Sequence, residues 1–275
     1  MHALLIGIDN YPGSGSDLSG CVNDVHDWAE LLGPECESIE TLVNRAATKA
    51  GMVRAIKALL NKLAAGDWGV LFYSGHGTWL PDENGDEPDG RDEAFCPYDF
   101  DRRLLFDDEL KDLLAARPQG SRVLLVTDCC HSGSIHRAIG QNTTARKKCL
   151  LPEQLSPAVV YERPRRRDLA SEIRFRALRW LKQPPLPGVV HISGCADTEY
   201  SYEHVDDAGR SMGAMSRVAR EAYAEMQETK ASKRTFREWH ARIGKELPER
   251  RYPQSPQLNA YAKEARLVVP GLDRR

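Results

Sequence analysis

The chain has 275 residues, of which 41% are hydrophobic, so it is long enough to bury one sizeable core. Its charges are balanced, with 38 Lys and Arg against 40 Asp and Glu, and this excludes a strong overall field for nucleic acid or an anionic membrane. The seven cysteines are irregularly spaced, which disfavours a disulfide framework or a structural zinc site. No signal peptide and no run of roughly 18 apolar residues is found, so we expect a soluble, cytoplasmic protein.

Short apolar runs alternate with amphipathic stretches along the chain. Strands are expected at residues 2–8, 39–43, 68–73, 123–127 and 189–193. Helices are expected at residues 22–32, from a cap at Thr48 to residue 63, and at 107–116, 210–227 and 235–247. This alternation predicts an α/β fold with a mainly parallel central sheet and helices on both faces.

Two stretches interrupt the alternation. Residues 82–92 form an acidic segment that contains Gly and Pro, and residues 137–187 are long, weakly patterned and rich in Arg and Lys, with helical character only near 172–180. A loop of this length inside a compact domain is usually functional or disordered. We find no repeat and no clear boundary, so we expect a single domain over residues 1–275 that carries a long basic loop.

Two of the expected strands end in residues suited to catalysis. His76 follows one strand between two glycines, and Cys130 follows another, 54 residues further along the chain. Reacting groups in open α/β sheets collect beyond the carboxyl ends of the strands. A neighbouring imidazole raises the thiolate fraction of a cysteine and can protonate a leaving amine. We therefore expect His76 and Cys130 to form a catalytic pair, with backbone N–H groups near Gly77 and Cys130 holding the oxyanion.

Neighbouring residues offer alternatives to this pair. Cys129 is adjacent to Cys130, but successive residues at a strand end point to opposite faces, so we expect Cys129 to be inert. His131 would have to fold back on its own neighbour to act as the base, and His136 is expected in a loop. Asp128 could instead cap a backbone turn, and Asp24 could simply favour a helix start.

The two motifs, at residues 73–77 (YSGHG) and 128–133 (DCCHSG), resemble the signature motifs of metacaspases and their prokaryotic relatives, the orthocaspases. Residues 20–24 (GCVND), 192–195 (ISGC) and 257–258 (QL) also match the pattern of that family. The similarity runs from about residue 3 to residue 262. It implies a caspase-like αβα sandwich, a monomer, and cleavage of protein or peptide substrates after Arg or Lys.

The resemblance also assigns roles by position. Cys130 corresponds to the nucleophile and His76 to the general acid and base, while Asp24 and Asp128 correspond to the acidic floor of the specificity pocket, which Cys21 and Ser74 line. Two carboxylates beside the nucleophile favour a cationic substrate side chain and disfavour aspartate.

Calcium is an activator that the resemblance implies, with no role in the chemistry itself. Its ligands in the family match Asp92, Asp107 and Asp108, but a fourth acidic position falls on Arg137. A cation there opposes metal binding, and Asp107 and Asp108 could equally cap a helix.

The leading hypothesis is a cysteine endopeptidase specific for Arg or Lys that processes itself within the basic loop. Candidate cleavage residues are Arg146, Lys147, Lys148, Arg163, Arg165, Arg166 and Arg167. A catalytically silent caspase-like adaptor is the alternative, although the intact pair argues against it. Another Cys-His enzyme, such as an acyltransferase, would have no use for an acidic pocket, and the G-x-S-x-G elbow is missing.

Overall fold

In a computed structural model, the described residues are 1–81, 91–130, 146–156, 159, 184–196, 199–250 and 252–273. Within them, six strands form a central sheet in the order β11-β8-β7-β3-β1-β2. The strands are β1 (His2–Gly7), β2 (Ser38–Val43), β3 (Trp68–Ser74), β7 (Arg122–Asp128), β8 (Val189–Ser193) and β11 (Gln257–Asn259). All neighbours pair in parallel except β11, which is antiparallel to β8. The expected mainly parallel sheet is confirmed.

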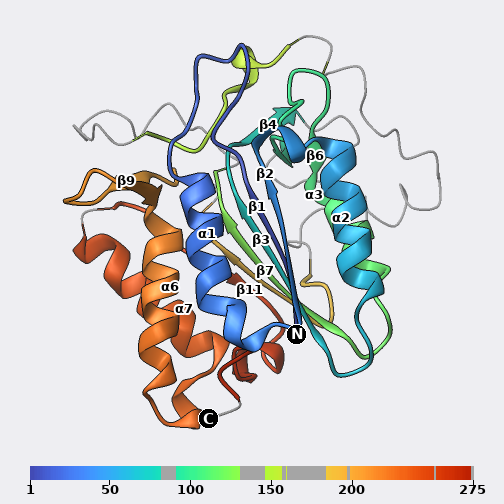
Figure 1. The fold of residues 1–275 in the computed structure, drawn as a ribbon, viewed down its shortest axis with the longest axis vertical. Coiled ribbons are helices and arrows are strands. Elements are labelled where there is room, and N and C mark those ends of the chain that lie inside the picture. The colour runs from blue at the N-terminus through green and yellow to red at the C-terminus, as the bar shows by residue number, and fades with distance from the viewer. Residues whose placement is uncertain are drawn as a thin grey trace.

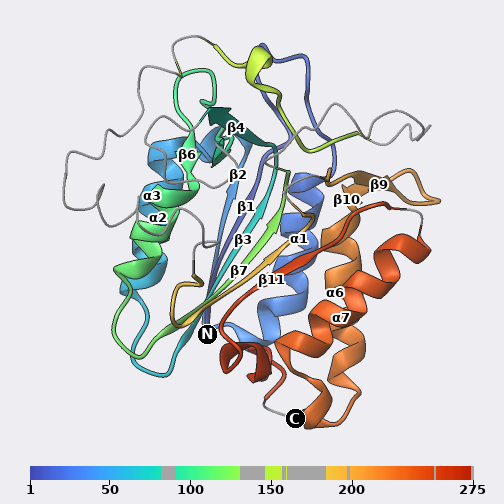
Figure 2. The same ribbon diagram turned by 180° about the vertical axis from the view of Figure 1, so that it is seen from behind.

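Helices cover both faces of this sheet (Figures 1 and 2). Helices α1 (Cys21–Leu32), α6 (Ala214–Gln227) and α7 (Phe236–Glu249) lie on one face, and α2 (Lys49–Asn61) and α3 (Asp107–Ala115) lie on the other. The strands are apolar on both sides, so alternate residues enter two separate hydrophobic clusters. Leu4 and Ile6 belong to the cluster under α2 and α3, whereas Ala3 and Leu5 belong to the cluster under α1, α6 and α7.

The register of the sheet brings three strand ends together. Gly7 pairs with Ser74, and Ser74 pairs with Asp128, so β1, β3 and β7 end at the same level. The segments that follow these strands therefore meet at the carboxyl edge of the sheet, where a parallel α/β fold places its ligands.

Two small sheets stand at the same edge. Strands β4 (Gly77–Pro81), β5 (Arg91–Phe95) and β6 (Leu105–Phe106) form one, and β9 (Glu203–Val205) and β10 (Ser211–Gly213) form an antiparallel hairpin. Isolated bridges also join residue 147 to Tyr202 and residue 149 to Gly77, so part of the basic loop is held between these two sheets.

Most expected elements match the structure within two residues, and Thr48 caps α2 by accepting a hydrogen bond from the Gly51 N–H at 3.1 Å. One expected helix is wrong at its start. Residues 211–213 form β10 instead of the first turn of a helix, because they pair with β9 and the Gly213 N–H donates to Asp24. Within the described residues, no helix is both long and apolar enough to cross a bilayer.

Candidate active site

His76 and Cys130 both lie just beyond the carboxyl edge of the sheet. Each follows the last residue of its strand by two positions, Ser74 in β3 and Asp128 in β7, and these two last residues are register partners. His76 is 1% exposed and Cys130 is fully buried. The sequence therefore predicted correctly that the two motifs would lie side by side.

The ring of His76 is oriented by a backbone carbonyl. Its Nε2 lies 2.6 Å from the Ser16 carbonyl oxygen, which can only accept, so Nε2 carries the proton and Nδ1 holds the free lone pair. Tyr11 packs against the His76 ring, with 4.5 Å between the ring centroids. The Tyr11 hydroxyl accepts a hydrogen bond from the backbone N–H of His76. Within the described part of the chain, Nδ1 is buried and has no hydrogen-bond partner. Nδ1 is therefore the nitrogen of His76 that can accept a proton.

Burial lowers the pKa of His76 to about 4, although the hydrogen bond to the Ser16 carbonyl opposes this effect. The imidazole is therefore neutral near pH 7 and able to accept a proton.

Cys130 is held between backbone groups of the segment before β9. Its Sγ accepts from the Ser201 N–H and donates to the Ser201 carbonyl at 3.6 Å. Burial raises the pKa of the Cys130 thiol, so the thiol is protonated while the site is closed. Cys129 points instead into the hydrophobic cluster under α2 and α3, as expected for the inert neighbour.

The carbonyl of Lys148 occupies the position expected for a substrate carbonyl. It accepts hydrogen bonds from the N–H of Cys130 at 3.1 Å and of Gly77 at 3.2 Å. These are the two groups that the sequence predicted as oxyanion donors. The carbonyl before the Lys148–Cys149 peptide bond therefore lies against both of these N–H groups.

The side chain of Lys148 is fully buried in an acidic pocket. Its Nζ donates to Ser74 Oγ at 2.8 Å and lies 3.1 Å from Asp128 Oδ2 and 3.3 Å from Asp24 Oδ2. Both carboxylates are in turn fixed by other groups. Ser74 Oγ and the Gly213 N–H donate to Asp24, at 2.7 and 2.9 Å. The structure thus brings together three of the four residues predicted to form the pocket, around a cation.

The first turn of α6 holds the second carboxylate. Asp128 Oδ2 accepts from the Ser216 N–H at 3.0 Å and from Ser216 Oγ at 2.8 Å. The N-terminus of a helix favours negative charge, so this position suits a carboxylate. Asp128 therefore caps a backbone turn and contacts Lys148 at the same time.

Burial and charge act against each other in the pocket. Burial alone would lower the pKa of Lys148, but the carboxylates of Asp128 and Asp24 and the neighbouring Cys21 and Glu203 raise it well above its ordinary value. Burial raises the pKa of Asp24 to about 6 in spite of Lys148, with a contribution from Asp128. Two carboxylates buried this close to one another are stabilised by a cation between them, which Lys148 supplies here.

Comparison with known proteins decides the family. A family model described as metacaspase, peptidase C14 domain, matches residues 1–138. Metacaspase-1 of Candida glabrata is 30% identical over 94% of this chain and 72% of its own length. The chain belongs to the metacaspase family.

Two further comparisons set the limits of this relationship. Metacaspase-7 of Arabidopsis thaliana is 38% identical over 53% of this chain, but over only 39% of its own length. The chain thus spans well under two thirds of that plant relative. A crystal structure of a protein from Geobacter sulfurreducens aligns over 97% of this chain and 96% of its own, with a TM-score of 0.71 and 27% identity. The expected caspase-like fold is therefore confirmed.

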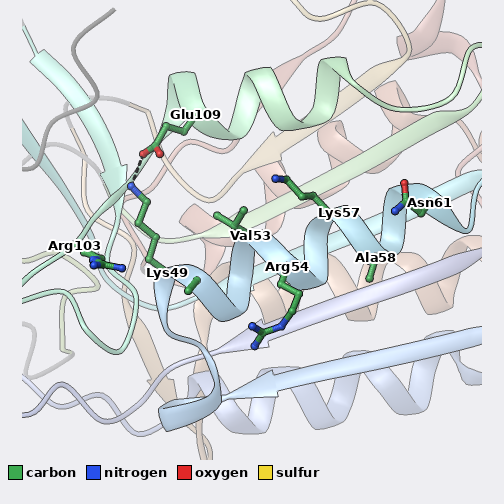
Figure 3. A pocket seen from close by; sticks show the side chains of 9 residues that line it. Lys49, Val53, Arg54, Lys57, Ala58, Asn61, Arg103 and Glu109 are labelled. Atoms are coloured by element: carbon green, nitrogen blue, oxygen red, sulfur yellow. Dashed lines mark hydrogen bonds and ion pairs between the residues drawn. The ribbon is translucent and has the colours of Figure 1, made fainter.

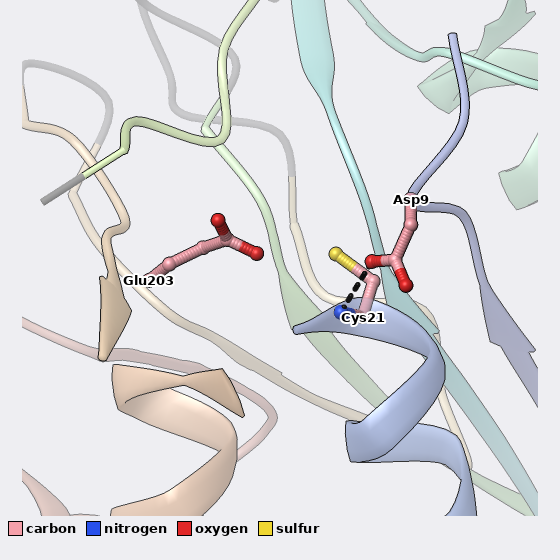
Figure 4. A group of neighbouring side chains, drawn as sticks. All are labelled: Asp9, Cys21 and Glu203. Carbon is pink, nitrogen blue, oxygen red and sulfur yellow. Dashed lines mark hydrogen bonds between the residues drawn. The ribbon is translucent and has the colours of Figure 1, made fainter. Parts of the chain in front are cut away.

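Cys21, the fourth predicted pocket residue, belongs to the start of α1. One ligand atom from each of Asp9, Cys21 and Glu203 lies within 4.8 Å of the others (Figure 4). The carboxylates are already bound, however: Asp9 accepts from the Cys21 N–H at 2.7 Å, and Glu203 accepts from the N–H groups of Ser19 and Gly20 at 2.7 and 2.6 Å. These hydrogen bonds hold the N-terminus of α1, and Asp24 lies in the first turn of this helix.

The carboxylates predicted to bind calcium lie on neighbouring elements. Asp92 is in β5, and Asp107 and Asp108 begin α3. Among the described residues their ligand atoms do not form a group within 4.8 Å of one another, and the predicted fourth position, Arg137, lies outside those residues. Calcium activation therefore stays a prediction.

A hollow of about 700 Å³ lies away from this edge, along α2 (Figure 3). Lys49, Arg54, Lys57 and Arg103 line it, and Lys49 Nζ is bonded to Glu109 Oε2 at 2.8 Å. None of the residues predicted for catalysis lines it, so we do not place the chemistry there.

Several predicted positions lie outside the described residues. They include His131, His136 and the candidate cleavage residues Arg163, Arg165, Arg166 and Arg167. In contrast, the site depends on groups that the sequence analysis missed, namely the carbonyl of Ser16, the backbone of Ser201, Gly213 and Ser216. Backbone groups leave no side-chain signal in a sequence, which is why Ser16 and Ser201 could not be found.

Proposed function

We propose that this chain is a cysteine endopeptidase that cleaves after Lys or Arg, and that its own Lys148–Cys149 bond is its first substrate. The observation that carries the proposal is the position of Lys148. Its side chain pairs with Asp24 and Asp128 while its carbonyl receives the N–H groups of Gly77 and Cys130. A substrate would have to meet both requirements at once.

In the proposed reaction, His76 Nδ1 takes the thiol proton and Cys130 Sγ attacks the carbonyl carbon of Lys148. The N–H groups of Gly77 and Cys130 stabilise the resulting oxyanion. The same imidazole then gives the proton to the departing nitrogen of Cys149, which leaves a thioester between Lys148 and Cys130. Water, activated by His76, hydrolyses the thioester to a new carboxylate at Lys148.

The two sides of this bond are held differently, which supports release after cleavage. Leu150, two residues beyond Lys148, is fully buried in the cluster under α2 and α3, and its N–H donates to the Gly77 carbonyl at 2.9 Å. Arg146 and Lys147, on the other side, are exposed. Cleavage would therefore allow residues 146–148 to leave the cleft, while Leu150 keeps the new start of the chain anchored.

The test is to incubate the purified chain beside Cys130→Ala and Lys148→Gln chains and to analyse the fragments by intact-mass spectrometry. We expect wild type to give a fragment that ends at Lys148 and another that begins at Cys149, and neither variant to give them. The processed enzyme should then cleave fluorogenic peptides ending in Lys or Arg but not in Asp. An intact, folded wild-type chain that cleaves none of these peptides would refute the proposal and favour the adaptor alternative.

A further inference from the structure

The segment before the Lys148–Cys149 bond pairs with the protein as a β-strand. The Lys148 N–H donates to the Ser201 carbonyl at 3.0 Å, and the Glu203 N–H donates to the Arg146 carbonyl at 2.9 Å. Lys147 and Tyr202 form the antiparallel bridge between these bonds. Peptides that add a strand to an exposed edge gain affinity from main-chain bonds and specificity from alternate side chains. Each side chain of residues 146–148 therefore lies in a different subsite of the cleft.

Alternate side chains of the segment meet different chemistry. Those of Arg146 and Lys148 leave one face of the strand, and that of Lys147 leaves the other. Lys147 Nζ lies 4.1 Å from the centre of the Tyr200 ring, which is the geometry of a cation–π contact. A ring that faces a cation in this way prefers a basic residue over a neutral one at the position before the specificity pocket.

The first residue of the segment meets a set of acceptors. Arg146 Nη1 donates to the Asp17 carbonyl at 2.9 Å and to Ser19 Oγ at 3.0 Å. These acceptors belong to the same turn as Ser16, whose carbonyl orients His76. A guanidinium reaches two acceptors at once, and a neutral side chain cannot replace it.

Resting on the proposed function, we propose that the processed enzyme selects extended segments with basic residues at three consecutive positions before the cleaved bond. Tyr200 contacts the side chain at the middle position, and the segment of residues 16–19 contacts the side chain at the first position. Residues 146–148, Arg-Lys-Lys, occupy these positions before self-cleavage and are the model for this substrate class. Tyr200 is a specificity-determining residue that contacts substrate but takes no part in the chemistry.

The test compares four coumarin-amide peptides on self-processed enzyme: acetyl-Arg-Lys-Lys, acetyl-Arg-Ala-Lys, acetyl-Ala-Lys-Lys and acetyl-Ala-Ala-Lys. We expect Lys at the middle position to raise kcat/KM by about two- to fivefold over Ala, the range for an exposed cation–π contact. Tyr200→Ala should abolish this gain, and Tyr200→Phe should keep it because the ring remains. Tyr261→Ala, at an exposed tyrosine that the cleft residues named above do not include, is the matched control and should also keep the gain.

Arginine at the first position should raise kcat/KM by about two- to fivefold over Ala, and Ser19→Ala should reduce that preference. Equal kcat/KM for all four peptides on wild type would overturn the proposal while leaving the proposed function intact. A gain for Lys that persists in Tyr200→Ala would overturn the role of Tyr200. A thermal unfolding curve that matches wild type shows that a variant is folded. No cleavage of any peptide by wild type would refute the proposed function, and this inference with it.

Discussion

Replacing Asp128 by Asn removes one charge from the acidic pocket around Lys148 and leaves the hydrogen bonds of Asp128 in place. The amide oxygen of Asn can still accept from the Ser216 N–H and hydroxyl, which now bind Asp128 Oδ2. The amide nitrogen would take the place of Oδ1, which is buried and has no partner within the described residues. The substitution therefore tests charge rather than shape.

The expected cost comes from the distance between Asp128 Oδ2 and Lys148 Nζ, which is 3.1 Å. Two unit charges at this distance interact by about 5 kcal/mol at an effective dielectric constant of roughly 20. The amide oxygen keeps part of this as a hydrogen bond, so we expect a loss of about 2–3 kcal/mol. That range agrees with the cost of removing one partner from a buried charge pair. It corresponds to a fall of about 30- to 150-fold in kcat/KM for peptides that end in Lys.

The assay measures kcat/KM for peptides ending in Lys and in Met, which separates charge recognition from the chemistry. Asp128→Asn should lose most of its activity on the Lys peptide and little on the Met peptide. Asp27→Asn is the control, because Asp27 lies in the same helix as Asp24 but pairs with Arg210 outside the pocket. An Asp128→Asn enzyme that melts like wild type yet keeps its preference for Lys would refute the reasoning.

Three further outcomes are expected. Gly213→Ala should reduce kcat/KM for cleavage after Lys by more than about 100-fold, because the added Cβ would overlap Asp128 Oδ2 and the ammonium group that Lys148 Nζ now places there. A kcat/KM equal to that of wild type would contradict this. Lys148→Arg should still self-process in mass spectra, since a guanidinium can pair with both carboxylates; an intact chain would count against the pocket. The free energy of unfolding of Cys130→Ala should rise between pH 4 and 6.5, because the unfolded chain binds more protons at His76 than the folded chain does. Urea titrations should show that this rise is smaller by about 3 kcal/mol in Cys130→Ala/His76→Asn. Equal pH profiles for the two variants would refute the lowered pKa of His76.

Sequence patterns predicted the parts of the site that follow strands. His76, Ser74, Asp128 and Cys130 stand at or just after the ends of β3 and β7, and parallel pairing brings such ends together whatever the details of the loops. Asp24 is in the first turn of α1, as expected from its helical spacing. These positions depend on local periodicity and on one general property of parallel sheets, so a single sequence was sufficient.

The remaining parts depend on pairing between distant segments. Seven basic residues were candidates for self-cleavage, and among the three that the structure describes, the bridges of residues 147 and 149 to Tyr202 and Gly77 favour Lys148 as the proposed cleavage residue. Gly213 was assigned to a helix because residues 210–227 have helical spacing, whereas its N–H is taken by Asp24, 189 residues earlier in the chain. Contacts at such separations leave no periodic signal in the sequence.

Residues 146–148 are part of the same chain as the cleft that they occupy, and this link would determine the kinetics of the proposed self-cleavage. Because Lys148 already lies in the pocket of its own chain, the first cut needs no encounter between molecules. The half-time of maturation should therefore be the same in dilute and concentrated solutions, whereas one molecule processing another would speed up with concentration. The first-order rate constant of maturation would then depend on the chemistry at Cys130 and not on the protein concentration.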